Sequence, residues 1–409
     1  MYARTLSLYE FKCFHKAKLH LQYPGRKGSG ASEISNINLI LGDNGGGKSS
    51  VLRGLAIAIL APALSRSGFV PYRLVRRQAP GTPEVGHCLL KVRAVADPYE
   101  TQGGLTSRFE LLARLEPSLR GELDRLYLDY TPESPIEPLL DDDSSPAFFV
   151  VGYGATRRVE TSDFSESTAR RSRGLRYQRI AGLFEDHVGL RPLNTWLTRL
   201  HRKENRFEEA VALLNAVLPS NVRFSGKFLE GEDQYSFDFD GVPTPFTALS
   251  DGYKAFIGWA GDLIGHLADV APLGKRLNEI TGVVLVDEID LHLHPAWQRQ
   301  VAPQLSTTFP CLQFVFSSHS PLVASSVRRE NIFVTDRAEN GTATINQIDE
   351  YVYGQSVEHV LLSSYFGLTT TRPPSFQQEA EGLFKRVAEG DAQAALEFLN
   401  RLTASNQSR

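Results

Sequence analysis

A glycine-rich stretch near the N-terminus, LGDNGGGKSS at residues 41–50, has the residue types and spacing that hold the phosphates of a nucleotide. Its glycines and its Lys-Ser pair satisfy the pattern G-x-x-x-x-G-K-[S/T]. Glycines let backbone N–H groups close around phosphates, and the start of a following helix adds favourable partial charge. Lys48 would reach the β- and γ-phosphates, and Ser49 would bind Mg²⁺. We therefore predict an ATP site at Gly42, Asp43, Asn44, Gly45, Gly46, Gly47, Lys48, Ser49 and Ser50.

A second stretch, VVLVDEID at residues 283–290, delivers two carboxylates to the end of an apolar strand. Ligands of open α/β sheets bind at the carboxyl ends of the strands. Asp287 is predicted to hold Mg²⁺, and Glu288 to polarise the attacking water. A solvated acidic turn is the alternative, and the glycine-rich loop in the same chain disfavours it.

A third stretch, LSDGYKAF at residues 249–256, opens a predicted helix with small residues, which makes a second site suited to an anion. One phosphate chain does not need two such sites from one subunit, whereas two subunits arranged head to tail do. Leu249, Ser250, Asp251 and Gly252 are therefore predicted to cap the ATP of a partner subunit. An ordinary turn, with Ser250 or Asp251 as helix cap, is the alternative.

A fourth stretch, FVFSSHS at residues 314–320, ends an apolar strand in hydroxyl residues and His319. A lone histidine at a strand end is usually structural. Because this strand follows the Asp-Glu strand along the chain, His319 is placed to touch the γ-phosphate. The predicted catalytic residues are thus Lys48, Glu288 and His319.

The elements that must position these residues alternate between strands and helices. INLILG runs into the glycine-rich loop, and KSSVLRGLAIAILAPAL follows it as a helix. This alternation predicts an α/β fold with a mainly parallel sheet, an antiparallel β patch within about 69–115 and a helical insertion. The predicted segments are a nucleotide-binding lobe at 1–160, a largely helical insertion with a basic segment at 161–245, the rest of the ATPase core at 246–335 and a mostly helical extension at 336–409.

The bulk composition excludes several classes of protein. The 409 residues carry a formal net charge of −3, so no overall positive field points to nucleic acid or an acidic membrane surface. Three scattered cysteines suit a reducing compartment. The N-terminus lacks the pattern of a secretory signal, and the apolar run at 55–64 is shorter than the roughly 20 residues that span a bilayer. We expect a cytoplasmic protein without a membrane partner.

The four stretches together, in this order, resemble the ABC-type ATPases among the P-loop proteins. They correspond to the Walker A motif at 42–49, the signature loop at 249–253, the Walker B motif at 283–288 and the switch histidine at 319. LSLYEFKCF followed by INLILGDNGGGKSS is similar to the SMC, RecF and OLD branch of that superfamily. LSDGY and DEIDLHLHPAWQ are similar to compact bacterial ATP-binding proteins of AAA type, including those of the phage-defence systems Septu, retron and PARIS.

This resemblance implies an ATPase that uses ATP and Mg²⁺ and forms a homodimer or higher homo-oligomer, with two sites at the interface. It also implies a separate effector, a nuclease or a toxin, in phage defence or DNA transactions. An ATP-binding scaffold with little turnover is an alternative, and a transporter engine is a less favoured one.

The sequence departs from the superfamily in three places. Asp251 and Tyr253 stand where transporters carry Gly and Gln, and His294 stands at a usually acidic position. The glutamine that couples the metal to movement is not evident. The role stays unassigned among Tyr153, Thr156, Arg157, Gln78 and Gln178.

A basic segment follows the strand AFFVVGYG. It could neutralise the phosphates of a nucleic acid or contact a partner protein. A solvated surface segment is as good an interpretation, and Arg157 and Arg158 could instead serve the nucleotide or the dimer interface. The candidate contacts are Arg157, Arg158, Arg170, Arg171 and Arg173.

Overall fold

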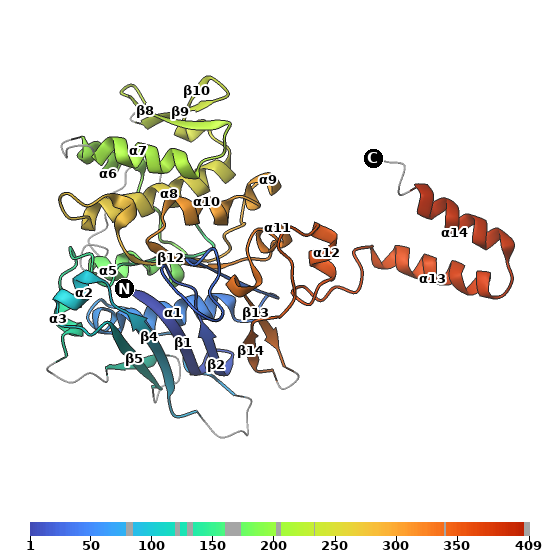
Figure 1. The fold of residues 1–409 in the computed structure, drawn as a ribbon, viewed down its shortest axis with the longest axis horizontal. Coiled ribbons are helices and arrows are strands. Elements are labelled where there is room, and N and C mark those ends of the chain that lie inside the picture. The colour runs from blue at the N-terminus through green and yellow to red at the C-terminus, as the bar shows by residue number, and fades with distance from the viewer. Residues whose placement is uncertain are drawn as a thin grey trace. The chain divides into compact units, whose positions relative to one another are not determined.

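The computed structural model describes residues 1–78, 85–118, 123–128, 134–159, 173–201, 206–232, 234–338 and 341–404 (Figure 1). The chain separates into two compact units, Met1–Val357 and Glu358–Arg409. Arg170 and Arg171 lie outside the described residues.

The first unit is built on one mixed sheet, with eleven strands in the described part of the chain. Their order across the sheet is β6-β5-β4-β1-β2-β14-β13-β3-β12-β11-β7. The strands are β1 (Tyr2–Phe11), β2 (Phe14–His20), β3 (Ile37–Gly42), β4 (Cys88–Val95), β5 (Arg108–Pro117), β6 (Asp124–Leu128), β7 (Val150–Tyr153), β11 (Gly282–Val286), β12 (Leu312–Ser317), β13 (Ile332–Arg337) and β14 (Ala343–Asn346).

One half of this sheet is parallel and the other is antiparallel. Strands β7, β11, β12, β3 and β13 pair in parallel, whereas β2, β1, β4, β5 and β6 form antiparallel pairs. Every residue of β11 and β12 is buried, as expected for parallel strands covered on both faces. The predicted α/β fold with an antiparallel β patch is confirmed, and the patch continues the parallel sheet.

The register of the parallel strands brings three sequence motifs to one edge. Gly42 at the end of β3 pairs with Thr335 on β13, and Ser317 at the end of β12 pairs with Ile40 on β3. On the other side of β12, Val286 of β11 pairs with Phe316. The glycine-rich loop, the Asp-Glu pair and the histidine loop therefore all begin at the same edge of the sheet.

Helix α1 (Lys48–Ser65) follows the glycine-rich loop and packs on the sheet. By length and composition it is the one described helix that could cross a membrane, but 72% of that window is buried inside the fold. Its burial on nearly all sides explains why it is apolar without a distinct polar face.

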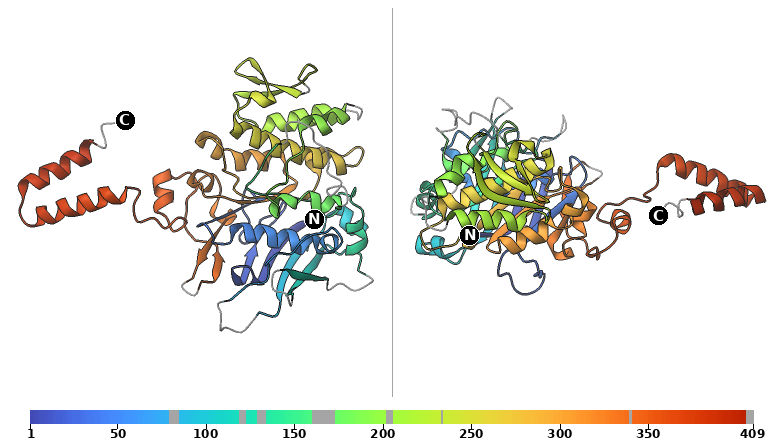
Figure 2. Two further views of the ribbon diagram at one scale, coloured as in Figure 1. Left: turned by 180° about the vertical axis from the view of Figure 1, so that it is seen from behind. Right: turned by 90° about the horizontal axis from the view of Figure 1, so that it is seen from above.

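Three further layers follow beyond the sheet (Figures 1 and 2). Helix α8 (Asp251–Val270) packs on α6 (Leu193–Leu200) and α7 (Arg206–Val217), and α7 in turn packs on α10 (Val301–Thr308). The outermost layer is a three-stranded antiparallel sheet within the predicted helical insertion, where the sequence predicts one strand, at YSFDFDG (residues 235–241), and the structure adds the two strands beside it. Its strands are β8 (Val222–Leu229), β9 (Gln234–Phe239) and β10 (Val242–Pro245).

The first unit also contains the shorter helices α2 (Pro98–Gln102), α3 (Ile136–Asp141), α5 (Leu175–Gln178), α9 (Pro295–Gln298) and α11 (Pro321–Ala324). Helix α12 (Val357–Leu362) begins at the boundary between the units. The second unit contains two longer helices, α13 (Pro374–Ala388) and α14 (Ala392–Ala404). Their rings Phe384 and Phe398 meet edge to face at 5.9 Å.

Candidate nucleotide site

The glycine-rich loop between β3 and α1 needs its glycines for two reasons. Gly42 and Gly47 have φ of 139° and 100°, in the left-handed region that side chains disfavour. The loop is also closely packed, because a Cβ at Gly42 would lie 2.2 Å from the Thr335 Oγ1, and one at Gly47 would lie 2.7 Å from the Cys13 Sγ. The loop therefore has the backbone shape and tight support that a phosphate-binding loop requires.

The amine of Lys48 lies at the mouth of this loop. Its Nζ donates hydrogen bonds to the carbonyl oxygens of Gly42, at 2.8 Å, and Asp43, at 3.0 Å. Burial lowers the pKa of Lys48, while the nearby carboxylates of Asp287 and Glu288 oppose that shift. Lys48 is therefore a cation held among carbonyls and carboxylates, in reach of a ligand at the loop.

The two acidic residues after β11 are held by different contacts, one through its side chain and the other through its backbone. Asp287 is only 7% exposed and accepts a hydrogen bond from the Ser317 hydroxyl. The oxygen of the same hydroxyl accepts a hydrogen bond from the backbone N–H of Glu288 at 2.8 Å, and Glu288 has a φ of +50°. Ser317 therefore holds the turn that leaves the Asp287 carboxylate against the sheet and the Glu288 side chain in the pocket. Its role was not predicted from the sequence, because a serine at a strand end carries no distinct signal.

Arg157 braces the same turn from the loop after β7. Its guanidinium donates hydrogen bonds to the carbonyl oxygens of Asp287, at 3.0 Å, and Glu288, at 2.6 Å. Burial lowers the pKa of Arg157 to about 10, with the carboxylates of Asp287, Asp290 and Glu288 opposing the shift. The contact supports the left-handed backbone of Glu288, so Arg157 is a positioning residue for that side chain.

Replacing Arg157 by Gln is therefore expected to lower the kcat for ATP hydrolysis about tenfold and to change KM little, because two carbonyls of the turn lose their charged donor. Arg223, which is exposed on β8, supplies the matched control Arg223→Gln. Steady-state kinetics of both variants gives the kcat and KM that test this expectation. An Arg157→Gln enzyme with a normal kcat would show that the turn holds Glu288 without this contact.

One cavity of about 890 Å³ joins these parts. Glu288 and His319 line it together with Asn44, Gly45, Gly47, Lys48, Ser49 and Ser50. The structure thus brings the predicted catalytic residues and most of the loop to one pocket. Asp287 lies behind the pocket wall, and Leu249, Ser250, Asp251 and Gly252 are not among the described residues that line it.

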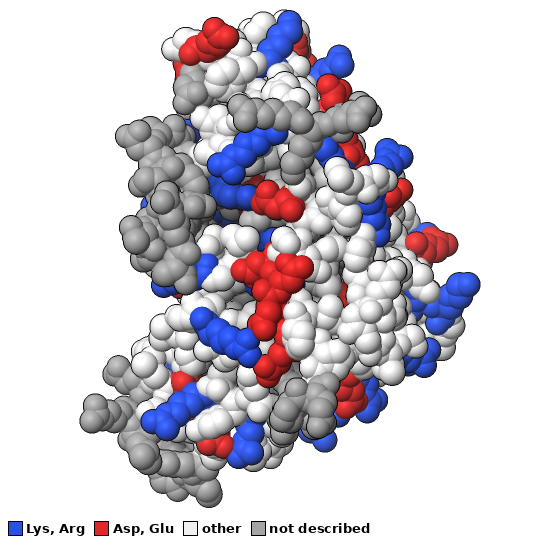
Figure 3. Space-filling view, turned by 90° about the vertical axis from the view of Figure 1, so that its left-hand side faces the viewer, with Lys and Arg blue, Asp and Glu red and all other residues white. Residues whose placement is uncertain are grey.

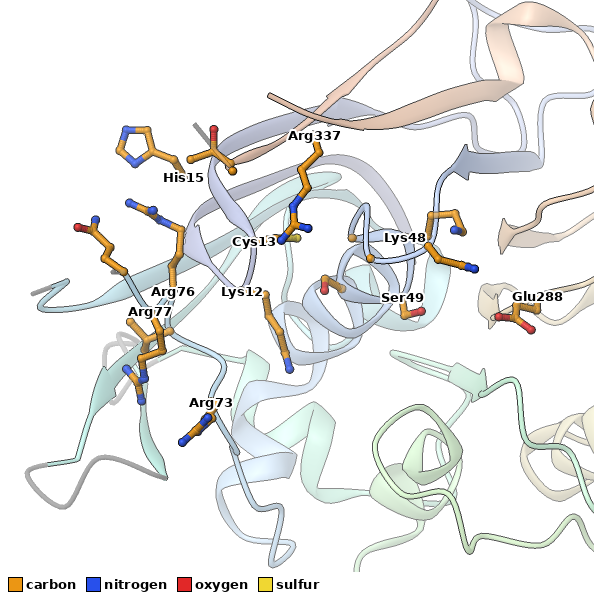
Figure 4. Close-up of a pocket in the computed structure, with 18 of the residues that line it drawn as sticks. Lys12, Cys13, His15, Lys48, Ser49, Arg73, Arg76, Arg77, Glu288 and Arg337 are labelled. Carbon is orange, nitrogen blue, oxygen red and sulfur yellow. The ribbon is translucent and has the colours of Figure 1, made fainter. Parts of the chain in front are cut away.

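The other end of the pocket is strongly basic (Figure 4). Arg76 pairs with Glu10 and Arg77 with Asp124. This basic wall was not predicted, because its members come from separate parts of the sequence that only the antiparallel half of the sheet and the end of β13 bring together. The wall consists of Lys12, His15, Arg73, Arg76, Arg77 and Arg337.

The predicted Mg²⁺ ligands fit the ion by their chemistry. The Ser49 hydroxyl and the Asp287 carboxylate are hard oxygen donors at the same edge of the sheet. No group of three or more His, Cys, Asp or Glu side chains suited to a metal occurs in the described residues. Mg²⁺ is usually held by one or two carboxylates together with water and substrate phosphates, and the Ser49 hydroxyl and the Asp287 carboxylate are donors of that kind.

The signature residues start helix α8. Ser250 is the N-cap residue, yet its hydroxyl makes no capping hydrogen bond, and Ser250 and Asp251 are both exposed. A Cβ at Gly252 would lie 2.4 Å from the carbonyl oxygen of His292, so this position requires glycine for packing. The capping alternative therefore lacks the side-chain bond that would identify it, and the hydroxyl of Ser250 is available to a ligand.

Two of the arginines predicted to contact a nucleic acid or a partner protein have different surroundings in the structure. Arg173 forms an ion pair with Glu185, while Arg158 is exposed. On the face drawn in Figure 3, acidic side chains gather near the centre with basic ones around them, so the described residues there form no unbroken basic surface.

Of the candidates for the coupling role, Gln78 lines the nucleotide pocket, and the Tyr153 hydroxyl donates a hydrogen bond to Asp262 on α8 at 2.9 Å. The sequence predictions of a nucleic-acid contact and of a coupling residue stay predictions.

Comparison with known proteins identifies a family. The profile of the family described as "AAA domain, putative AbiEii toxin, Type IV TA system" matches residues 37–325. Septu protein PtuA of Bacillus mycoides (strain KBAB4) is 24% identical over 377 residues, which cover 91% of this chain and 46% of that protein. Retron Vc95 probable ATPase of Vibrio cholerae serotype O1 biovar El Tor is 25% identical over 399 residues, which cover 82% of this chain and 74% of that protein.

Two further similarities are more limited. Retron Ec83 probable ATPase of Escherichia coli is 37% identical over 97 residues, covering 24% of this chain and 18% of that protein. The SMC head domain from Thermotoga maritima superposes with a TM-score of 0.47 at 15% identity, covering 86% of this chain and 100% of that one. The chain spans about half the length of the Septu protein that it matches.

Proposed function

The chain belongs to the AAA-domain family described as putative AbiEii toxin, Type IV TA system, and we propose that it is a Mg²⁺-dependent ATPase that dimerises head to tail on ATP and controls a partner effector in phage defence. One observation carries the proposal. Glu288, His319 and the glycine-rich loop line a single pocket, whereas the exposed Ser250 does not line it.

In the proposed reaction each residue has one task. Lys48 would exchange its bonds to the loop carbonyls for bonds to the β- and γ-phosphate oxygens, and Ser49 and Asp287 would hold Mg²⁺. The bound ion would neutralise the developing phosphate charge. Glu288 accepts a proton from the attacking water, and His319 donates a hydrogen bond to the phosphate that leaves.

The pocket of one subunit is completed by its partner in this proposal. Ser250 and the first N–H groups of α8 are exposed, uncapped and suited to an anion. Docked on the open side of the partner's pocket, they would reach its γ-phosphate, so ATP would hold two subunits together and hydrolysis would release them. The change in assembly is the signal that would reach the effector.

Replacing Ser250 by Arg tests this arrangement without weakening the fold, since the side chain is exposed and caps nothing. The variant is expected to bind ATP like wild type and to lose at least about tenfold in turnover, because the longer side chain blocks the partner's phosphate. Turnover and equilibrium binding of a fluorescent ATP analogue measure the two effects. The substitution Lys227→Ala, at an exposed position on β8, serves as control.

The proposed hydrolysis of ATP is tested by measuring the ATP turnover of the purified chain with Mg²⁺, with EDTA, and with duplex DNA added. Turnover that needs Mg²⁺ supports the proposal, and stimulation by DNA identifies nucleic acid as the trigger. ATP binding without turnover under any of these conditions would overturn it in favour of a scaffold.

The role in defence rests on the names of the relatives, a Septu protein and two retron ATPases. We expect cells carrying the gene together with its genomic neighbours to plate phage less efficiently than cells in which Glu288 is replaced by Gln. Equal plating would overturn the defence role and leave the ATPase assignment standing.

A further inference from the structure

A small second cavity of about 60 Å³ lies away from the nucleotide pocket, among the loop after β7, the segment 178–191 and helix α8. Its charged lining consists of Arg157, Arg179, Arg191, Asp262 and His266. A water molecule needs roughly 10–15 Å³ of such volume, so the cavity can hold more than one water or one small anion.

Arg179 has two unpartnered hydrogen-bond donors at this cavity, and its guanidinium lies 5.5 Å from the centroid of the Phe149 ring. The residue is 4% exposed, and its Nε and Nη1 are buried without any hydrogen-bond partner. Only Nη2 is engaged, at 3.2 Å from the carbonyl oxygen of Asp143. Burial lowers the pKa of Arg179 to about 10; the neighbouring cations Arg176 and Arg191 act in the same direction, and the carboxylates of Asp269 and Asp143 oppose the shift. A buried cation with free donors is unfavourable unless something negative completes it.

The carboxylate that lines the cavity is already committed elsewhere. Asp262 accepts bonds from Arg191 Nε, at 2.9 Å, and from the hydroxyl of Tyr153, at 2.9 Å. Its second oxygen also lies 3.2 Å from the Nε2 of His266. Arg157, in turn, is bound to the two carbonyls of the Walker B turn. Arg191 has a second carboxylate partner in Asp269, at 2.8 Å from its Nη1. Arg157 and Arg191 are therefore both engaged, and the free donors at the cavity are those of Arg179.

From the two free donors of Arg179, which is buried at a cavity that two further guanidinium groups line, we propose that the cavity binds one small monovalent anion of chloride size. The anion would accept hydrogen bonds from the Nε and Nη1 of Arg179. It would neutralise the cluster that joins the loop carrying Arg157 to α8, the helix that begins at Ser250. The site would thus stabilise the connection between the ATP pocket and the surface that the partner subunit meets.

Bromide is the probe, because it replaces chloride and scatters X-rays anomalously. A crystal of the full chain grown with sodium bromide is expected to show an anomalous peak within hydrogen-bonding distance of the Arg179 Nε. In solution, bromide replacing gluconate at constant ionic strength should raise the Tm of the wild type by a few degrees and then level off, as ligand binding to the folded state requires.

Two substitutions separate this site from general salt effects. Arg179→Gln should abolish the bromide response, whereas Arg206→Gln should keep it, because Arg206 has its own carboxylate partner in Glu209. If Arg179→Gln does not fold, Arg179→Met, which also removes the charge and the donors, takes its place. Absence of the anomalous peak, or an equal bromide response in wild type and the Arg179 variant, would overturn the proposal and assign the cavity to water.

Discussion

Glu288→Gln is expected to lower ATP turnover by about 10²–10⁴-fold while ATP binding stays close to wild type. The amide keeps the size of the carboxylate and its place beside Lys48 and His319, but it cannot accept the proton of the attacking water. The backbone of residue 288 is held by Ser317 and Arg157, and both contacts use backbone atoms that the substitution leaves in place. The effect should therefore fall on chemistry and not on folding.

Single-turnover hydrolysis and equilibrium ATP binding measure the two quantities separately. Glu232→Gln, at an exposed position, controls for the loss of one carboxylate. Hydrolysis by Glu288→Gln at the wild-type rate would remove Glu288 from the mechanism, and another acid would have to act as base.

Lys48→Met is expected to weaken ATP binding roughly 10–100-fold, because it removes a charged hydrogen-bond donor to the phosphates. The methionine keeps most of the apolar stem, and the glycines that shape the loop are unchanged. The bonds that Lys48 makes to the carbonyls of Gly42 and Asp43 are lost, at a cost that thermal unfolding of the variant would measure.

Isothermal titration with ATP and Mg²⁺ gives the affinity, and Lys227→Met, on an exposed strand position, gives the matched control. An unchanged affinity would place the phosphates away from the glycine-rich loop. The two variants should show different defects: Lys48→Met should bind ATP more weakly, whereas Glu288→Gln should bind ATP normally but hydrolyse it slowly.

The parts of the site that the sequence predicts well are local. The glycine-rich loop and the Asp-Glu pair each follow an apolar strand, and parallel strands place their carboxyl ends together. The spacing of Gly42, Lys48 and Ser49 follows from a loop that leads directly into a helix. These features are encoded within a few residues, so one sequence is enough to identify them.

The parts that the sequence did not predict depend on contacts between distant segments. Arg157 was considered for nucleic acid, the dimer interface or the coupling role, but its bonds to the carbonyls 130 and 131 residues away become visible only when β7 and β11 pair. The basic wall needs the β1–β2 turn, the segment before β4 and the end of β13 to meet. Of the sheet β8–β10, the sequence predicts only the middle strand, at YSFDFDG, and the strands that pair with it on both sides were not predicted.

The central claim is that each ATP site is shared by two subunits, and mixing two inactive variants tests it most directly. Lys48→Met lacks a working loop but keeps Ser250, and Ser250→Arg keeps the loop. A mixed dimer would contain one complete site, so a one-to-one mixture is expected to recover up to about a quarter of wild-type turnover from two preparations that are each nearly inactive. A mixture that stays as inactive as its components, or a Ser250→Arg preparation that is fully active alone, would contradict the shared site.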